Sequence, residues 1–209
     1  MPPPLAAFCL ACEPPPQTSD PLDSKPRGPF DPSACLPDLA AGLYEGALAR
    51  AIRRFKYGAR PDLAAPLGER LRRVIERGFV RSDLVIPVPL HPRKLRDRGY
   101  NQTALLASAI ASTAGARFAP RALERTRDTT AQASLDRAAR KSNLDGAFRA
   151  RDPLEIQGKH VLLVDDVATT GSTLRACADA LRRAGASRVT TIVLARRAAS
   201  GPRAPSAAA

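Results

Sequence analysis

Residues 161–174 constrain the fold of this chain more than any other stretch. Four apolar residues, 161–164, are followed by Asp165 and Asp166, then by small residues, and then by Leu174, where helical spacing begins. A continuous apolar run is typical of a parallel strand that is covered on both faces. The segment therefore predicts a buried strand that ends in two carboxylates and leads through a small-residue loop into a helix.

The loop between this strand and this helix has the chemistry of an anion site. Backbone amides at the start of a helix have no partners within the helix, and they favour phosphate. A glycine lets the backbone approach a phosphate closely, and open α/β sheets bind ligands at the carboxyl ends of their strands. The predicted phosphate-binding residues are Ala168, Thr169, Thr170, Gly171, Ser172 and Thr173.

The two acids need a different role, because carboxylates repel phosphate. We expect Asp165 and Asp166 to accept hydrogen bonds from the hydroxyl groups of a ribose. Successive residues of a strand point to opposite faces, so both acids reach one ribose only if the strand ends at Asp165. If the strand continues through Val167, one acid of the pair is structural.

Three other interpretations of this segment compete with a phosphate site. A Walker A loop requires Gly-Lys-Ser/Thr, but the loop contains no lysine. A dinucleotide fingerprint requires three glycines, and only Gly171 is present. The last alternative is an ordinary capped helix after a strand, with both acids solvated. The full 14-residue combination is uncommon, and this favours the phosphate site.

Hydrophobic periodicity places the rest of the chain in the α/β class. The predicted helices cover about 44–57, 63–77 and 102–114, and the predicted strands cover 84–88 and 189–194. The strand at 161–164, the following helix and the strand at 189–194 form a βαβ unit, in which Cys177 falls on the buried face of the helix. The polar stretch 120–150 is expected to have little core of its own. We predict one domain over 41–197, with a mostly parallel central sheet flanked by helices.

The two ends of the chain are expected to lack regular structure. Residues 1–40 hold about half of the 20 prolines, and residues 198–209 consist mostly of Ala, Pro and Ser. The first segment predicts an extended linker and the second a disordered tail. No secretory signal and no apolar run of membrane-spanning length is present, so we expect a cytoplasmic protein.

The charge of the chain points to an anionic partner. Lys and Arg number 33 against 20 acids, which gives +13. Phosphate esters and nucleic acid are both suitable partners, although an Arg-rich composition without functional meaning explains the excess equally well. The six Phe and three Tyr offer little base stacking. Nucleic acid would therefore be bound mainly through its phosphates, with steep salt dependence.

These residues resemble a known family. Residues 161–174 resemble the 5-phosphoribosyl-1-pyrophosphate (PRPP) motif of type I phosphoribosyltransferases. Residues 87–102 and 43–58, together with an amino-terminal Cys-x-x-Cys, resemble the ComF family of competence-associated phosphoribosyltransferase-like proteins. The likeness extends over about 43–197. It implies a type I phosphoribosyltransferase-like fold, in which Asp165 and Asp166 serve as the catalytic, ribose-binding acids.

The resemblance also implies roles for other residues. The 5′-phosphate would lie in the loop at 168–173, and Mg²⁺ would bridge the pyrophosphate and the ribose oxygens. The implied pyrophosphate loop consists of Val88, Pro89, Leu90, His91 and Arg93. The implied lid contains Arg140 and Asn143. The alternatives are a solvated helix start for the basic run 93–98, a capping role for His91, and a structural role for the lid pair.

The amino-terminal cysteines depart from the family pattern. Family members often carry two Cys-x-x-Cys pairs that bind Zn²⁺ tetrahedrally. Here Cys9 and Cys12 form one pair and Cys35 is single. A three-cysteine zinc site with Asp31, Asp38 or a partner chain as the fourth ligand is one interpretation. A degenerate zinc-ribbon-like remnant without metal is favoured over it.

Two functions follow from the resemblance. The first is an enzyme that transfers phosphoribose from PRPP to a nitrogen nucleophile of unknown identity and releases pyrophosphate. The second is a non-catalytic module that binds PRPP, a nucleotide or single-stranded DNA during DNA uptake in natural competence, with the DNA-uptake machinery as partner. No aromatic platform for an acceptor base follows Ile192, so binding of PRPP is better supported than its turnover.

Overall fold

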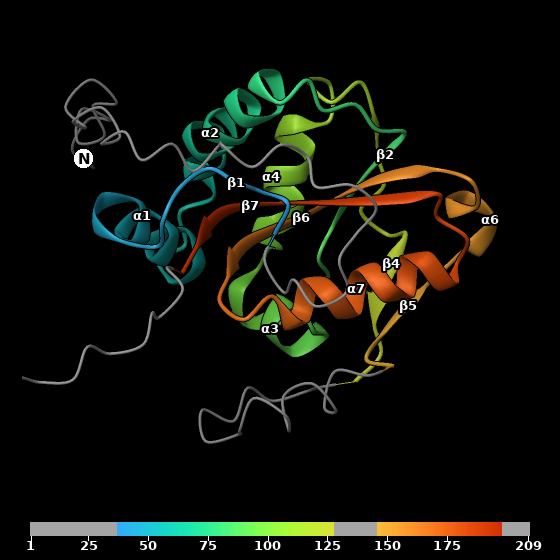
Figure 1. The fold of residues 1–209 in the computed structure, drawn as a ribbon. Helices are drawn as coiled ribbons and strands as arrows, with labels where there is room; N and C mark the ends of the chain where they lie inside the picture. Colours follow the sequence, from blue (N-terminus) through green and yellow to red (C-terminus); the bar gives the residue numbers. More distant parts are fainter. Residues whose placement is uncertain (1–36, 128–145, 198–209) are drawn as a thin grey trace, which may run out of the picture. The chain divides into compact units, whose positions relative to one another are not determined.

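The computed structural model describes residues 37–127 and 146–197 (Figure 1). The predictions for Cys9, Cys12 and Cys35, for the lid residues Arg140 and Asn143, and for the tail at 198–209 lie outside the described residues.

A five-stranded sheet forms the centre of the domain, in the order β1-β7-β6-β2-β3, and every pairing is parallel. The strands are β1 (Leu39–Ala40), β2 (Leu84–Pro87), β3 (Arg117–Phe118), β6 (His160–Ala168) and β7 (Arg188–Arg196). The predicted α/β class and parallel sheet are confirmed. The first strand begins before residue 41. Asp38, the residue before it, is tied to β7, because its carboxylate accepts hydrogen bonds from the backbone N and Oγ1 of Thr191. Asp38, a candidate zinc ligand, therefore anchors the sheet edge.

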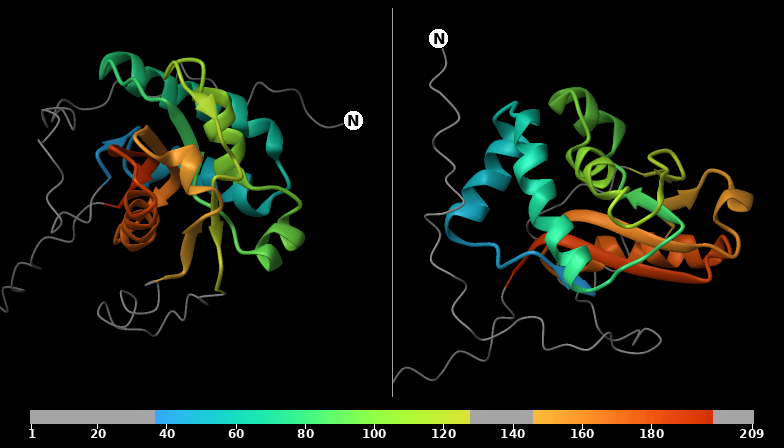
Figure 2. Two further views of the ribbon diagram at one scale, coloured as in Figure 1. Left: turned by 90° about the vertical axis from the view of Figure 1, so that its right-hand side faces the viewer. Right: turned by 90° about the horizontal axis from the view of Figure 1, so that it is seen from above.

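Helices cover both faces of the sheet (Figures 1 and 2). The helices α2 and α4 pack against each other and against the central strands, while α7 packs on the opposite face. The helices and the 3-10 turn are α1 (Gly46–Tyr57), η3 (Pro61–Leu63), α2 (Ala64–Arg77), α3 (Pro92–Arg98), α4 (Gln102–Ile110), α6 (Pro153–Ile156) and α7 (Ser172–Arg183). The prediction that the third helix reaches 114 was wrong, since α4 ends at Ile110.

The region between α3 and α4 shows why two helices form in place of one. Gly99 adopts φ 78°, in the left-handed region, and ends α3. Asn101 then caps α4, because its side chain accepts a hydrogen bond from the backbone N of Thr103 at 3.0 Å. The chain therefore turns sharply at 99–101, and Gln102 becomes the first residue of α4.

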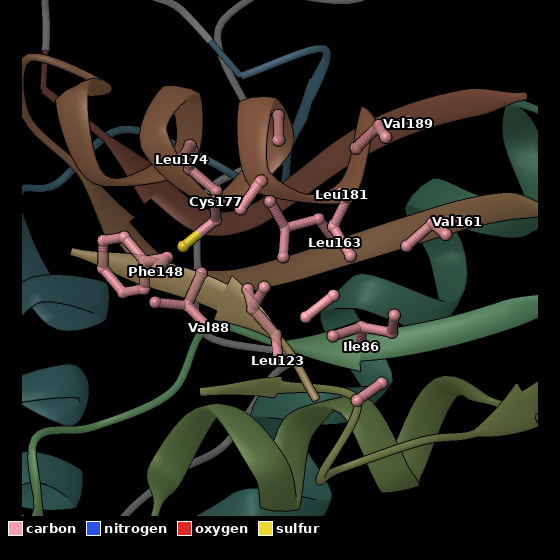
Figure 3. Packing of buried hydrophobic residues seen from close by; sticks show 14 of the residues in the cluster. Ile86, Val88, Leu123, Phe148, Val161, Leu163, Leu174, Cys177, Leu181 and Val189 are labelled. Atoms are coloured by element: carbon pink, nitrogen blue, oxygen red, sulfur yellow. The ribbon is translucent and has the colours of Figure 1, made fainter. Parts of the chain in front are cut away.

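Both ends of the polar stretch 120–150 contribute to the core, contrary to expectation. The strands β4 (Leu123–Arg125) and β5 (Phe148–Ala150) form a separate antiparallel pair. Leu123 and Phe148 are buried in the same hydrophobic cluster as Cys177 and Leu181 of α7 (Figure 3). The side chains on alternate positions of β4 and β5 thus extend the core beneath α7. The prediction that Cys177 is a core residue is confirmed.

Candidate functional site

The strand β6 continues past both acids to Ala168, four residues beyond the apolar run that predicted it. Its register with β7 pairs Asp165 with Val193 and Val167 with Ala195. The strand therefore runs through Val167, which is the condition under which one acid of the pair is structural. The two acids have different surroundings: Asp165 contributes to the pocket formed by the following loop, and Asp166 contacts side chains from α1 and α4.

Asp166 is held by two buried contacts. It is 3% exposed, and it is the one charged residue that is buried within 37–127 and 146–197. The Nζ atom of Lys56 lies 2.8 Å from Oδ1, and Nε2 of Gln102 donates to Oδ2 at 2.9 Å. Burial alone would lower the pKa of Lys56, but the charge and the hydrogen bond of Asp166, together with the nearby charge of Asp165, outweigh it and the pKa is raised. Lys56 therefore stays charged, and each carboxylate oxygen of Asp166 has a partner.

The Asp166 contacts belong to a larger network that joins α1 to the α3–α4 turn. Arg98 donates a hydrogen bond to Oε1 of Gln102, and the Tyr100 hydroxyl donates to the backbone O of Phe55. The rings of Phe55 and Tyr100 are 5.9 Å apart, and the guanidinium of Arg98 lies 5.2 Å from the ring centre of Tyr57. The two stretches that supported the family resemblance, 43–58 and 87–102, therefore meet at Asp166.

Sequence reasoning assigned no role to Lys56 or Gln102. Both residues lie in stretches that were recognised as typical of the family, so the signal was present. A single sequence does not pair Lys56 with Asp166, however, because the two positions are distant along the chain and no local spacing connects them.

Asp165 has no comparable cation within contact in the described part of the chain. Its Oδ1 accepts a hydrogen bond from the backbone N of Asp166 at 2.8 Å, and its side chain lines a pocket together with residues 167–174. Removal from water raises the pKa of Asp165 to about 7; the adjacent charge of Asp166 adds to this shift, and the more distant Lys56 opposes it. The carboxyl group of Asp165 is thus the one available to a ligand in the pocket.

The loop after β6 forms the remainder of the pocket. Gly171 adopts φ 71° as the residue preceding α7 and provides no side-chain cap. The hydroxyl groups of Thr170 and Ser172 are 2.9 Å apart, and Thr170 Oγ1 also accepts a hydrogen bond from the backbone N of Ser172 at 3.4 Å. All six predicted phosphate-binding residues line the pocket. The arrangement combines a glycine turn, small hydroxyl side chains and a helix start, which suits an anion.

The predicted pyrophosphate loop lies beside Asp165. The backbone N of Val88 donates to the backbone O of Val164 at 2.9 Å, so this loop leaves the sheet from the strand next to β6. The backbone O of Val88 accepts hydrogen bonds from Thr103 Oγ1 at 2.9 Å and Asn101 Nδ2 at 3.3 Å. His91 caps α3, because its Nδ1 accepts from the backbone N of Arg93 at 3.3 Å. The capping role given as the alternative for His91 is therefore observed.

The described residues contain neither a cluster of metal-ligating side chains nor a membrane-spanning helix. No group of three or more His, Cys, Asp or Glu side chains is placed to hold a metal ion within 37–127 and 146–197. None of the helices in the same residues has the length and apolar character that crossing a bilayer requires.

Comparison with known proteins identifies the family. The model of the phosphoribosyl transferase domain matches residues 102–206. The DNA utilization protein YhgH of Escherichia coli O6:H1 is 36% identical over 158 residues, which cover 73% of this chain and 69% of that protein. Competence protein F of Haemophilus influenzae is 36% identical over 115 residues, covering 54% and 50%, and Competence protein ComFC of Streptococcus pneumoniae is 31% identical over 157 residues, covering 73% and 65%. This chain belongs to the ComF family of phosphoribosyltransferase-like proteins. The predicted resemblance is confirmed.

Solved structures also show similarity to this ComF-family chain. Glutamine PRPP amidotransferase from B. subtilis, complexed with ADP and GMP, is 21% identical with a TM-score of 0.48, and the allosteric regulatory enzyme of purine biosynthesis is 21% identical with a TM-score of 0.47. The matches cover 68% of this chain but only 30% and 29% of those longer chains.

Proposed function

We propose that this ComF-family protein binds PRPP with Mg²⁺ in the pocket after β6 and acts on its phosphoribosyl group. The observation that carries the proposal is the shared pocket: Asp165 and the hydroxyl-rich loop 168–173 line the same hollow at the carboxyl end of a central parallel strand. A phosphate in the loop would place an attached ribose within reach of a carboxylate acceptor. A cytoplasmic location is part of the proposal.

Each part of PRPP has a proposed binding group. The loop amides and the hydroxyl groups of Thr169, Thr170, Ser172 and Thr173 bind the 5′-phosphate. Asp165 accepts hydrogen bonds from the ribose hydroxyls. The backbone of residues 88–91 and the side chain of Arg93 bind the pyrophosphate, since this loop leaves the neighbouring strand beside Asp165.

Asp166 is proposed as a positioning residue in the ribose-binding pair. Its contacts with Lys56 and Gln102 fix the end of β6, and with it the side chain of Asp165. A charged residue held by a cation and an amide orients the adjacent backbone without needing a ligand. The pair predicted as joint ribose acceptors is therefore divided into one acceptor and one anchor.

The described residues fit a magnesium ion that arrives with its substrate. Mg²⁺ is commonly bound through one or two carboxylates and substrate phosphates, with several waters retained. Asp165 provides a single open carboxylate, as such a site requires. The ion would neutralise the pyrophosphate leaving group. Fixed loop amides and Asp165 would orient the phosphoribosyl group as positive charge develops on the ribose during transfer to the acceptor.

Isothermal titration calorimetry with PRPP and Mg²⁺ tests the proposal. Wild type is expected to bind, and Asp165→Asn is expected to weaken binding at least about ten-fold, in line with the loss of a charge-assisted hydrogen bond. Asp179→Asn on α7 is a matched control, since Asp179 pairs with Arg182 away from the pocket. Absence of PRPP binding by the folded wild type would refute the proposed function. Release of pyrophosphate with a panel of nitrogen nucleophiles would then identify an acceptor.

A second candidate function is binding of single-stranded DNA, and a specific surface favours it. Residues 92–97 of α3 are exposed and include Arg93, Lys94 and Arg96, and α1 exposes Arg50, Arg53 and Arg54. Both helices lie at the end of the sheet that carries the PRPP pocket (Figure 1). Proteins named for DNA utilization and competence are its relatives. Affinity for a single strand should fall steeply with salt; affinity that is equal at 50 and 200 mM salt would exclude this function.

A further inference from the structure

Tyr57 is an unusual side chain for its place in the fold. It is the last residue of α1 and is 78% exposed, although it directly follows Lys56, which contacts the buried Asp166. Most large apolar or aromatic side chains in the described residues are buried, and Phe79 is the other aromatic with comparable exposure, at 89%. Tyr57 thus presents a ring to solvent from a position that is fixed to the candidate site.

The Tyr57 ring is held in place by its neighbours. Arg98 lies over it at 5.2 Å from the ring centre, as in a cation–π contact. Arg98 is itself fixed by its hydrogen bond to Gln102, which donates to Asp166. Because Arg98 covers one face of the ring and most of Tyr57 is exposed, the opposite face is open. A ring with one face braced and the other free is suited to stack on a planar partner.

Positive charge surrounds this ring. Arg53 and Arg54 precede Tyr57 by four and three positions on α1, so all three share one side of the helix, and all are exposed. Arg98 comes from α3, whose exposed residues Lys94 and Arg96 add further charge. Aromatic rings flanked by cations are the elements that bind single-stranded nucleic acid, with bases stacked and phosphates neutralised. This charge disfavours a cationic partner at this surface.

We propose that Tyr57 and Arg98 form a stacking platform for one base of single-stranded DNA. The proposal rests on the strand-binding function above and names its contact residue. Tyr57 stacks on the base through its open face, Arg98 supports the ring from behind, and Arg53 and Arg54 contact the adjoining phosphates.

Fluorescence anisotropy with a labelled single strand tests the platform. Tyr57→Ala is expected to weaken binding about ten-fold, because stacking of a base on an aromatic side chain has a substantial effect on affinity. Tyr57→Phe should keep most of the affinity. Phe79→Ala is the matched control: it removes a comparably exposed ring between α2 and the start of β2, toward the amino ends of the strands, and should leave strand affinity unchanged.

A strand that carries abasic sites separates stacking from charge. Tyr57→Ala should lose affinity for the ordinary strand but bind the abasic strand as wild type does, whereas Arg53→Gln should weaken binding of both strands. Equal strand affinities of wild type and Tyr57→Ala would overturn the platform while leaving strand binding intact. Absence of any strand binding by wild type would overturn both. Displacement of the strand by free nucleosides at matched nucleotide concentration would assign the platform to a small acceptor, and would also overturn the proposal.

Discussion

The two faces of β6 at its carboxyl end bear consecutive acids in contrasting surroundings. On one face, Asp166 is 3% exposed and both of its carboxylate oxygens have side-chain partners, Lys56 and Gln102. On the other face, Asp165 lines an open pocket with hydroxyl groups and backbone, and its pKa is raised to about 7. One acid is already neutralised by the protein, and the other is left to a ligand.

This difference shows how a strand divides a two-residue motif. Side chains alternate along a strand, so adjacent acids meet the layers on opposite sides of the sheet. The layer that contains α1 and α4 provides a cation and an amide, while the α7 layer provides a loop. A pair of acids that looks uniform in sequence therefore combines an anchor with a binding group, and stability measurements should distinguish them.

The largest effect on stability is expected when the buried Asp166 loses its cation, Lys56. Lys56→Met leaves Asp166 buried without its charge partner, and loss of one member of a buried pair costs about 3 kcal/mol or more. We expect the free energy of unfolding, measured by urea denaturation at pH 7.5, to fall by about 3 kcal/mol, a value at the lower end because the Lys56 side chain is 20% exposed.

Two further variants test the cause of this loss of stability. Arg60→Gln breaks the exposed pair between Arg60 and Asp62, whose side chains are 48% and 45% exposed, and should leave the urea midpoint close to that of wild type. Lys56→Met/Asp166→Leu removes both charges and should be more stable than Lys56→Met alone. If the double variant is no more stable than the single one, the contrast between the faces is not electrostatic.

The fold was largely predictable because its signals are local. The apolar run at 161–164, the helical spacing from Leu174 and the strand at 189–194 predicted the βαβ unit, and β6, α7 and β7 confirm it. The prediction that the polar stretch 120–150 has little core was wrong at the two ends of that stretch, because Leu123 and Phe148 are isolated apolar residues on three-residue strands. Strands this short show no clear alternation, so their burial depends on α7 packing above them.

The site was predictable on one face of β6 only. The pocket residues 168–173 are contiguous in the sequence, and their types indicate anion binding without knowledge of the fold. The Asp166 network joins residues from α1, α3, α4 and β6, and a single sequence contains no spacing that brings them together. The end of β6 was also uncertain, since Asp165 and Asp166 interrupt the apolar pattern although the ladder with β7 continues.

An effect with the opposite sign is expected on the open face. Because the folded-state pKa of Asp165 is raised to about 7 from 3.8, the folded protein binds this proton more tightly than the unfolded chain does. The contribution of Asp165 to stability is therefore favourable at low pH and is lost as pH rises from about 4 to about 7. Asp165→Asn should come close to wild type near pH 4 and be more stable at pH 8, as measured by urea midpoints. An Asp165→Asn protein that is less stable than wild type at pH 8 would place Asp165 among the anchors.

The smallest effect on stability is expected at Gly171. There, stability and binding measurements together separate backbone strain from a loss of phosphate binding. Gly171 and Gly158 both adopt φ 71°, but Gly171 follows the carboxyl end of β6 and Gly158 precedes its amino end, with nothing near its Cβ position. An Ala at either position is strained in the left-handed region by about 1 kcal/mol, so urea denaturation should give similar losses for Gly171→Ala and Gly158→Ala. Calorimetry with PRPP and Mg²⁺ should then separate them: Gly171→Ala distorts the loop that approaches the 5′-phosphate and weakens binding, whereas Gly158→Ala binds as wild type does. Equal PRPP affinities for the two variants would show that the loop after β6 does not form the phosphate site, and the contrast between the two faces would lose its functional meaning.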